Sequence, residues 1–144
     1  MKMMGYFFCA TVFTWKDTVP FIPPITQGQV VKVYDGDTIT IASKLPYDHS
    51  PLYRFSVRLR GIDAPEMNGK TDEEKEAAQA SQKVLEALIL YKNVTLEKVG
   101  REKYGRLLAV VFYEEININE WMLTDHHAVK YNGGSKNASQ TKNI

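Results

Sequence analysis

Apolar and polar residues alternate along several short stretches of the chain, the pattern of β-strands with one buried face. Two such stretches, residues 29–34 and 38–42, are separated by an Asp-Gly pair, which is a strong signal for a hairpin turn. A third stretch covers residues 55–60 and ends at a glycine. Two further strands are predicted at 94–98 and 107–113, and the last is nearly all apolar, so we expect it to be central.

Two other segments have the spacing of amphipathic helices. Thr71 and Glu74 form a capping-box pattern, and apolar residues then recur every three or four positions until near Tyr91. A second helix is predicted from Asn117, its N-cap, to Val129. The order of three strands, a helix, two strands and a helix suits a small closed barrel with a helix inserted between its third and fourth strands.

The two ends of the chain differ in composition from the middle. Residues 3–15 are mostly apolar and aromatic and follow Lys2, which resembles a secretory signal, although no small-residue cleavage site follows. A bilayer needs about 20 apolar residues, more than this run offers. We therefore expect an apolar arm and a proline-rich linker over 1–27, a domain over 28–131, and a disordered tail over 132–144.

The role of the arm has two interpretations. It either contacts a membrane, helped by acylation of Cys9, or packs on the domain. Secretion and membrane association both remain open as localisations.

Composition excludes some classes of protein. At 144 residues with 44% hydrophobic and 24% charged residues, the chain is a globular protein of one domain. A net charge of +1 means that any binding of nucleic acid must depend on locally placed cations. Cys9 is the only cysteine, so the chain has no internal disulfide and no zinc-type cysteine cluster. The remote His49 and the adjacent His126 and His127 give poor support for a histidine metal site or a catalytic triad.

The richest chemistry follows the third predicted strand. Arg58 lies on this strand, and Asp63 and Glu66 come shortly after it, on a bend shaped by Gly61 and Pro65. Two carboxylates on a short bend repel each other unless a cation lies nearby, so the bend indicates a metal ion or a basic pocket. An ordinary solvated turn has the same composition and remains an alternative.

Two other motifs carry charged residues at strand ends. Asp35 and Asp37 flank the glycine of the first hairpin and would share one face of an extended chain, so they are either metal-side carboxylates or parts of a tight turn. Arg106 begins the last strand. It could instead form a surface ion pair with Glu102, which would contribute little to stability.

These motifs together resemble the staphylococcal (micrococcal) nuclease family. They are Asp-Gly-Asp-Thr at 35–38, Arg-Leu-x-x-Ile-Asp-x-Pro-Glu at 58–66 and Lys-Tyr-Gly-Arg at 103–106, and the similarity covers about residues 29–131. The resemblance implies an α+β fold dominated by a five-stranded OB-fold β-barrel, with an inserted helix and a second C-terminal helix. It also implies a calcium-dependent endonuclease that hydrolyses phosphodiester bonds of DNA and RNA and leaves 3′-phosphate ends. We infer no obligate protein partner and expect a monomer.

The resemblance implies a metal site with three protein ligands. Asp37 and Asp63 would bind Ca²⁺ together with the backbone carbonyl of Ala64, and Asp35 would be a nearby acid outside the ligand set. Calcium prefers hard oxygen ligands and tolerates irregular geometry, so two carboxylates, a carbonyl and waters suit it.

The remaining matched residues would act on the substrate. By the resemblance, Arg58 and Arg106 hold the phosphate, Glu66 is the general base, and Lys103 and Tyr104 lie at the nucleotide-binding rim. A guanidinium group can meet two phosphate oxygens at once, and a carboxylate can take a proton from water.

The sequence also departs from the family pattern. Ala64 stands where the family often has threonine, Arg60 replaces an apolar residue, the loop over 43–53 is longer, and no final helix follows Tyr131. The alternative function is a non-catalytic nucleic-acid or protein-binding module, as in Tudor-type proteins whose similar domains lack the acids and arginines of the site. Their presence here favours the enzyme.

Overall fold

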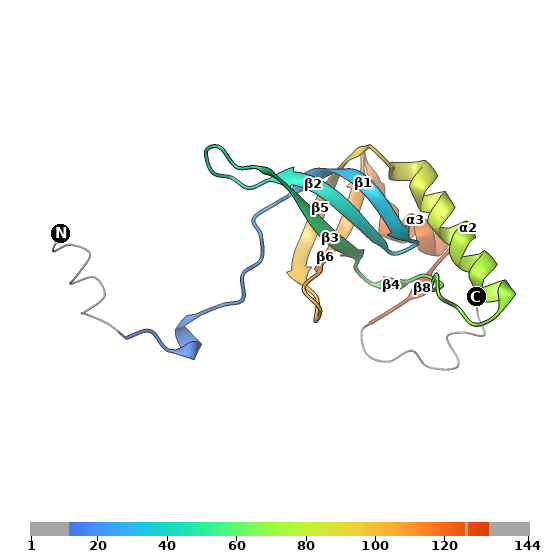
Figure 1. Cartoon of the computed structure of the whole chain (residues 1–144), viewed down its shortest axis with the longest axis horizontal. Coiled ribbons are helices and arrows are strands. Elements are labelled where there is room, and N and C mark those ends of the chain that lie inside the picture. The colour runs from blue at the N-terminus through green and yellow to red at the C-terminus, as the bar shows by residue number, and fades with distance from the viewer. Residues whose placement is uncertain (1–11, 126, 133–144) are drawn as a thin grey trace.

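The computed structural model describes residues 12–125 and 127–132, and five strands of this part form a closed barrel (Figure 1). The strands lie side by side in the order β3-β2-β1-β5-β6, with antiparallel neighbours, and a parallel pairing of β3 with β6 closes the barrel. The predicted OB-fold barrel of an α+β protein is therefore confirmed. The five strands are β1 (Gln27–Asp35), β2 (Thr38–Lys44), β3 (Leu52–Leu59), β5 (Asn93–Arg101) and β6 (Leu107–Tyr113).

The C-terminal end of strand β3 is buried on both of its faces. Val57 and Leu59 point into the core, as the alternation predicts, but Arg58 between them is also buried. In the parallel pairing with β6, Arg58 lies opposite Leu108. This register brings the guanidinium group of Arg58 to the start of β6, where the loop from β5 arrives.

Helix α2 (Asp72–Ile89) packs along the barrel (Figure 1). Its capping box is present, since the Glu74 backbone N–H donates to Thr71 Oγ1 at 3.1 Å. Its apolar face is buried against the core at Leu85 and Ile89, and the Gln82 side chain donates to the carbonyl of Val33 on β1. The inserted helix thus fixes the strand that leads into the Asp-Gly-Asp-Thr turn.

The second helix is shorter than predicted. Helix α3 (Ile118–Thr124) has the expected cap, because the Glu120 N–H donates to Asn117 Oδ1 at 3.0 Å. Its predicted extension to Val129 is wrong. The backbone N–H groups of His127 and Ala128 both donate to the carbonyl of Met122, which ends the helix and redirects the chain.

The redirected chain forms a short strand instead of a helix. Strand β8 (Val129–Lys130) pairs antiparallel with β4 (Ile62–Asp63), the segment just after Gly61. Val129 lies opposite Asp63 in this pairing. The C-terminal strand β8 therefore holds Asp63, one of the candidate site residues. The helical periodicity of the sequence did not indicate this pairing.

The described part of the N-terminal arm leads away from the barrel (Figure 1). It contains one 3-10 turn, η1 (Trp15–Asp17), and Trp15 is 90% exposed. The chain joins the barrel at Ile25, which is buried. The first part of the predicted arm, residues 1–11, and the predicted tail from 133 lie outside the described residues. Within the described part, the helices fall short of the length and apolarity that crossing a membrane requires.

A buried amide connects helix α3 to the barrel. Asn119 is the first polar residue on the inner side of α3, and its Oδ1 accepts the Val111 N–H at 3.0 Å. Its Nδ2 donates to the carbonyls of Arg60 and Ala109, at 2.8 and 3.2 Å. One side chain therefore joins the end of β3, the middle of β6 and α3. A short strand, β7 (Ile116–Asn117), precedes it and pairs with β6.

We expect Asn119→Asp to lower the free energy of unfolding by about 2 to 4 kcal/mol, because a buried carboxylate would face two carbonyl oxygens where an amide donated. Urea denaturation followed by circular dichroism measures the change. Asn117→Asp is the matched control, since Asp caps a helix as well as Asn does, and its stability should stay within about 0.5 kcal/mol of the wild type. Equal losses in both variants would contradict the prediction.

Candidate active site

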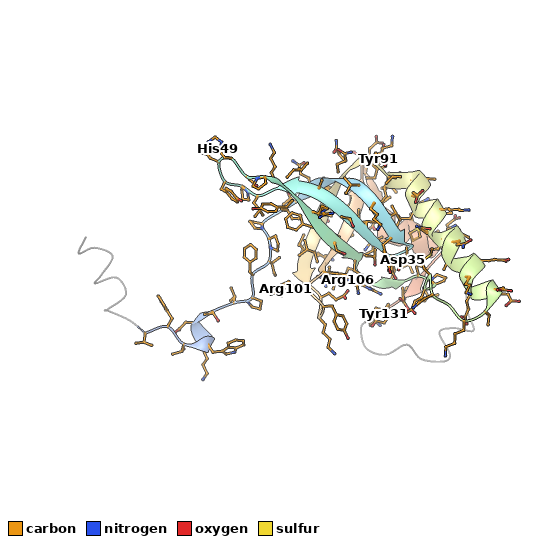
Figure 2. All side chains as sticks on the ribbon, viewed as in Figure 1. Asp35, His49, Tyr91, Arg101, Arg106 and Tyr131 are labelled. Atoms are coloured by element: carbon orange, nitrogen blue, oxygen red, sulfur yellow. The ribbon has the colours of Figure 1, made fainter. Side chains whose placement is uncertain are left out.

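One open cleft collects the residues that the three motifs predicted. It has a volume of about 900 Å³ and lies at the end of the barrel where the β1–β2 turn, the end of β3 and the β5–β6 loop meet. Figure 2 shows Asp35, Arg106 and Tyr131 at this end, with His49 at the tip of the remote β2–β3 hairpin. The lining includes eight of the nine predicted site residues: Asp35, Asp37, Arg58, Asp63, Glu66, Lys103, Tyr104 and Arg106.

The Asp-Gly-Asp-Thr turn is held against helix α2 and the segment after β4. A Cβ atom at Gly36 would lie 1.8 Å from Ser81 Oγ and 2.8 Å from Ala64 Cβ, so only glycine fits this position. Asp37, 6% exposed, accepts hydrogen bonds from Thr38 Oγ1 at 2.8 Å and from the Ala64 N–H at 2.9 Å. Ala64, the ninth predicted residue, thus lies directly behind the cleft.

Arg58 joins the two predicted metal-binding acids. Its Nη2 lies 3.2 Å from Asp63 Oδ1 and 3.7 Å from Asp37 Oδ2, and all three side chains are nearly buried. The guanidinium group thereby neutralises two carboxylates that would otherwise repel each other. The Cζ atom of Arg58 also lies 4.8 Å from the ring centroid of Tyr131, a cation–π contact.

The two acids of the turn have shifted pKa values in opposite directions. Burial and the neighbouring Asp37 carboxylate raise the pKa of Asp35 from 3.8 to about 7. Burial alone would also raise the pKa of Asp37, but hydrogen bonds from Asp35 and the Ala64 N–H and the charge of Arg58 hold this pKa below its ordinary value. Asp37 is therefore the acid of the pair that stays ionised and available to a cation.

Glu102 was not predicted as a site residue, yet it lies between both arginines. Arg106 Nε donates to Glu102 Oε1 at 2.9 Å, and Arg58 Nε lies 3.6 Å from Oε2. The alternative that pairs Arg106 with Glu102 is therefore correct as a contact, but the Glu102 side chain is only 17% exposed, so the pair is not a surface one. In the sequence, the spacing of four residues between Glu102 and Arg106 indicated the contact between these two residues. No feature of the sequence indicated the contact between Glu102 and Arg58.

The remaining predicted residues line the open edge of the cleft. Glu66 is exposed there, on the segment that leads from β4 to α2. Tyr104 is largely exposed on the β5–β6 loop, with Lys103 Nζ 5.7 Å from its ring centroid. An exposed carboxylate can contact a water molecule, and an exposed ring beside a cation can contact a base and a phosphate.

The donor set fits a hard divalent cation only with help from other ligands. Among the described residues, no group of three or more His, Cys, Asp or Glu side chains is arranged to hold a metal ion. Asp37 and Asp63, however, already share one positively charged group, the Nη2 of Arg58. Carboxylate oxygens of this kind suit Ca²⁺, which accepts carbonyls and waters to complete its shell.

Carboxylates and guanidinium groups thus converge in one cleft at the end of an OB-fold barrel. The model of the family described as staphylococcal nuclease homologue matches residues 56–144, more than half of the chain. The chain is a member of the staphylococcal nuclease family, as the motifs predicted. The matched region begins after the Asp-Gly-Asp-Thr turn.

Relatives in bacteria and in a plant are similar over parts of their length. An uncharacterized endonuclease of Haemophilus influenzae is 39% identical over 103 residues, which is 72% of this chain and 51% of that protein. An uncharacterized endonuclease of Escherichia coli is 30% identical over 115 residues, or 78% and 63%. A probable staphylococcal-like nuclease of Oryza sativa is 36% identical over 75 residues, or 52% and 14%. The chain thus spans between half and two thirds of the bacterial relatives.

We expect Asp35→Asn to stabilise the cation-free protein at about pH 8 and to change little at about pH 3.5. Because the folded state raises the pKa of Asp35 from 3.8 to about 7, stability is greatest below 3.8 and is lost as pH rises through this window. Asparagine stays neutral and can still donate to Asp37. Solvent screening leaves an effect on the order of 1 kcal/mol, measured by urea unfolding at both pH values. A gain of equal size at both would contradict the assignment.

Proposed function

We propose that this protein is a calcium-dependent endonuclease that hydrolyses phosphodiester bonds of DNA and RNA and leaves 3′-phosphate ends. The observation that carries the proposal is the convergence of Asp37, Asp63 and Arg58 within 4 Å in an open cleft that Arg106 also lines. Membership of a nuclease family and the names of the bacterial relatives support it.

Asp37, Asp63 and the carbonyl of Ala64 would hold the calcium ion. A calcium ion bound there supplies positive charge next to the phosphate and favours a hydroxide nucleophile. The buried hydrogen bonds of Asp37 to Thr38 and Ala64 keep its carboxylate in place for this role. Asp35, which has the raised pKa, stays outside the ligand set and hydrogen-bonds the backbone N–H of Asp37 at 3.1 Å.

Arg58 and Arg106 bind the scissile phosphate in this proposal. Attack on phosphorus concentrates negative charge on the non-bridging oxygens, and a guanidinium group meets two such oxygens with charge-assisted hydrogen bonds. Both groups are fixed by neighbouring carboxylates before substrate arrives. This arrangement lowers the cost of ordering them in the transition state.

Glu66 acts as general base in the proposal. Residues at the edge of the cleft bind the nucleic acid on either side of the scissile bond. The exposed Glu66 carboxylate can take a proton from the attacking water, help that typically increases the rate by about 10²- to 10⁴-fold. Lys103 and Tyr104, which line the cleft edge, would contact a neighbouring phosphate and base. With a net charge of only +1, the chain depends on these local cations. All residues proposed for this site come from one chain.

We expect the purified protein to nick supercoiled plasmid DNA and to cut RNA in buffer with Ca²⁺, and to lose both activities with a calcium chelator. The reason is that the arginines alone leave Asp37 and Asp63 facing the phosphate without a divalent ion to offset their charge. Product ends are assigned by labelling with a kinase before and after phosphatase treatment. Folded protein that leaves both substrates intact at every calcium level would favour the non-catalytic binding module instead.

We expect Arg58→Lys to lower kcat/KM by about 10²-fold or more, because an ammonium group keeps the charge but cannot form the paired hydrogen bonds of a guanidinium group. Arg54→Lys is the matched control: Arg54 is four residues earlier on β3, and it is exposed outside the cleft lining. Its kcat/KM should stay within about twofold of the wild type. Circular dichroism confirms folding of each variant, and equal activity of both variants would rule out the proposed role.

A further inference from the structure

One carboxylate is shared by the two arginines of the cleft. Glu102 Oε1 accepts a hydrogen bond from Arg106 Nε at 2.9 Å and also contacts Arg106 Nη2. Glu102 Oε2 lies 3.6 Å from Arg58 Nε. Glu102 therefore contacts each guanidinium group on its Nε side.

This carboxylate is buried to an extent that its hydrogen bonds do not explain. Oε2 is inaccessible to solvent and accepts no hydrogen bond from the described residues. A buried carboxylate oxygen with no donor is unfavourable, and such groups in folded proteins usually have a functional reason. In an ordinary surface salt bridge, a carboxylate oxygen in the position of Glu102 Oε2 would be hydrated by water.

The backbone around Glu102 fixes where its side chain can point. The Glu102 N–H donates to the Arg106 carbonyl at 2.8 Å, and the Gly105 N–H donates to the Glu102 carbonyl at 3.1 Å. Gly105 has a positive φ of 86°, which suits this tight turn. The loop between β5 and β6 is thus closed on itself, with Glu102 and Arg106 at its base.

The other guanidinium nitrogens face the candidate cation site. Arg58 Nη2 points toward Asp63 and Asp37, and Arg106 Nη1 lies 3.5 Å from Thr38 Oγ1, on the Asp-Gly-Asp-Thr turn. While Glu102 contacts the Nε side of both arginines, Arg58 Nη2 and Arg106 Nη1 therefore point to the same region of the cleft.

We propose that Glu102 is a positioning residue of this nuclease: its carboxylate clamps Arg58 and Arg106 side by side, so that both point at the scissile phosphate. This inference rests on the proposed function. Long side chains lose much rotamer freedom when they bind, and a prior clamp removes that cost from the transition state. The clamp acts on the arginines and does not itself touch substrate.

The test compares Glu102→Gln with the wild-type full-length protein. Glutamine keeps the shape and one acceptor but loses the charge and places an amide donor against a guanidinium group. We expect kcat per folded molecule to fall roughly 10- to 100-fold, with KM within about threefold, because misoriented groups lose transition-state contacts more than ground-state binding. Glu115→Gln, an exposed change outside the cleft lining, is the matched control and should keep wild-type kinetics.

A second readout is independent of activity. In wild-type protein the side-chain Nε–H protons of Arg58 and Arg106 should exchange with water more slowly than that of the exposed Arg54, as measured by NMR. Glu102→Gln should remove this difference. Glu102→Asp keeps the charge one methylene shorter, and its kcat should fall between those of the wild type and the glutamine variant; it replaces the glutamine variant if that does not fold.

Three results would overturn the inference. They are a rise in kcat/KM in Glu102→Gln, as expected if the carboxylate competed with phosphate; a fall in thermal stability with unchanged kcat; or fast exchange of both arginine protons in the wild type. If the wild-type protein shows no nuclease activity, the proposed function fails by itself, and the exchange measurement still decides whether Glu102 clamps the arginines.

Discussion

The structure depends on satisfying one buried guanidinium group. Arg58, 9% exposed at the end of β3, is surrounded by carboxylates that come from three separate segments: Asp37 from the β1–β2 turn, Asp63 from β4 and Glu102 from the loop after β5. Leaving such a charge without partners costs about 3 to 5 kcal/mol, so these segments must converge when the barrel closes. The same convergence assembles the cleft, so folding and site formation use the same contacts.

Pairings with strands outside the motifs hold this arrangement rigid. The parallel pairing of β3 with β6 sets Arg58 beside the β5–β6 loop, and the pairing of β4 with β8 holds Asp63. Asn119 joins the end of β3 to β6 and α3 from inside the barrel. Site residues carried by paired strands keep their geometry better than residues on free loops. Each of these contacts therefore joins the motif at residues 58–66 to a partner that lies outside the three motifs.

Charge in the cleft is close to balanced, which gives the proposed cation a clear physical role. Three carboxylates lie within 4 Å of Arg58, so its positive charge is largely offset before any ligand binds. A divalent ion on Asp37 and Asp63 would restore an excess of positive charge toward a phosphate. This accounts for how a chain with a net charge of +1 could act on nucleic acid without a large basic surface.

The sequence by itself determined the five barrel strands, the start of each of the two helices and the three motifs. Alternation, the Asp-Gly turn and the capping residues act between neighbours in the chain, so they can be recognised there. It did not determine the end of α3, since the Met122 carbonyl accepts from His127 and Ala128, which lead into the strand that pairs with β4. Only the tertiary structure decided that Glu102 is buried between two arginines and that Tyr131 covers Arg58. Burial and long-range contact depend on how the barrel closes, and no local pattern of residues records that.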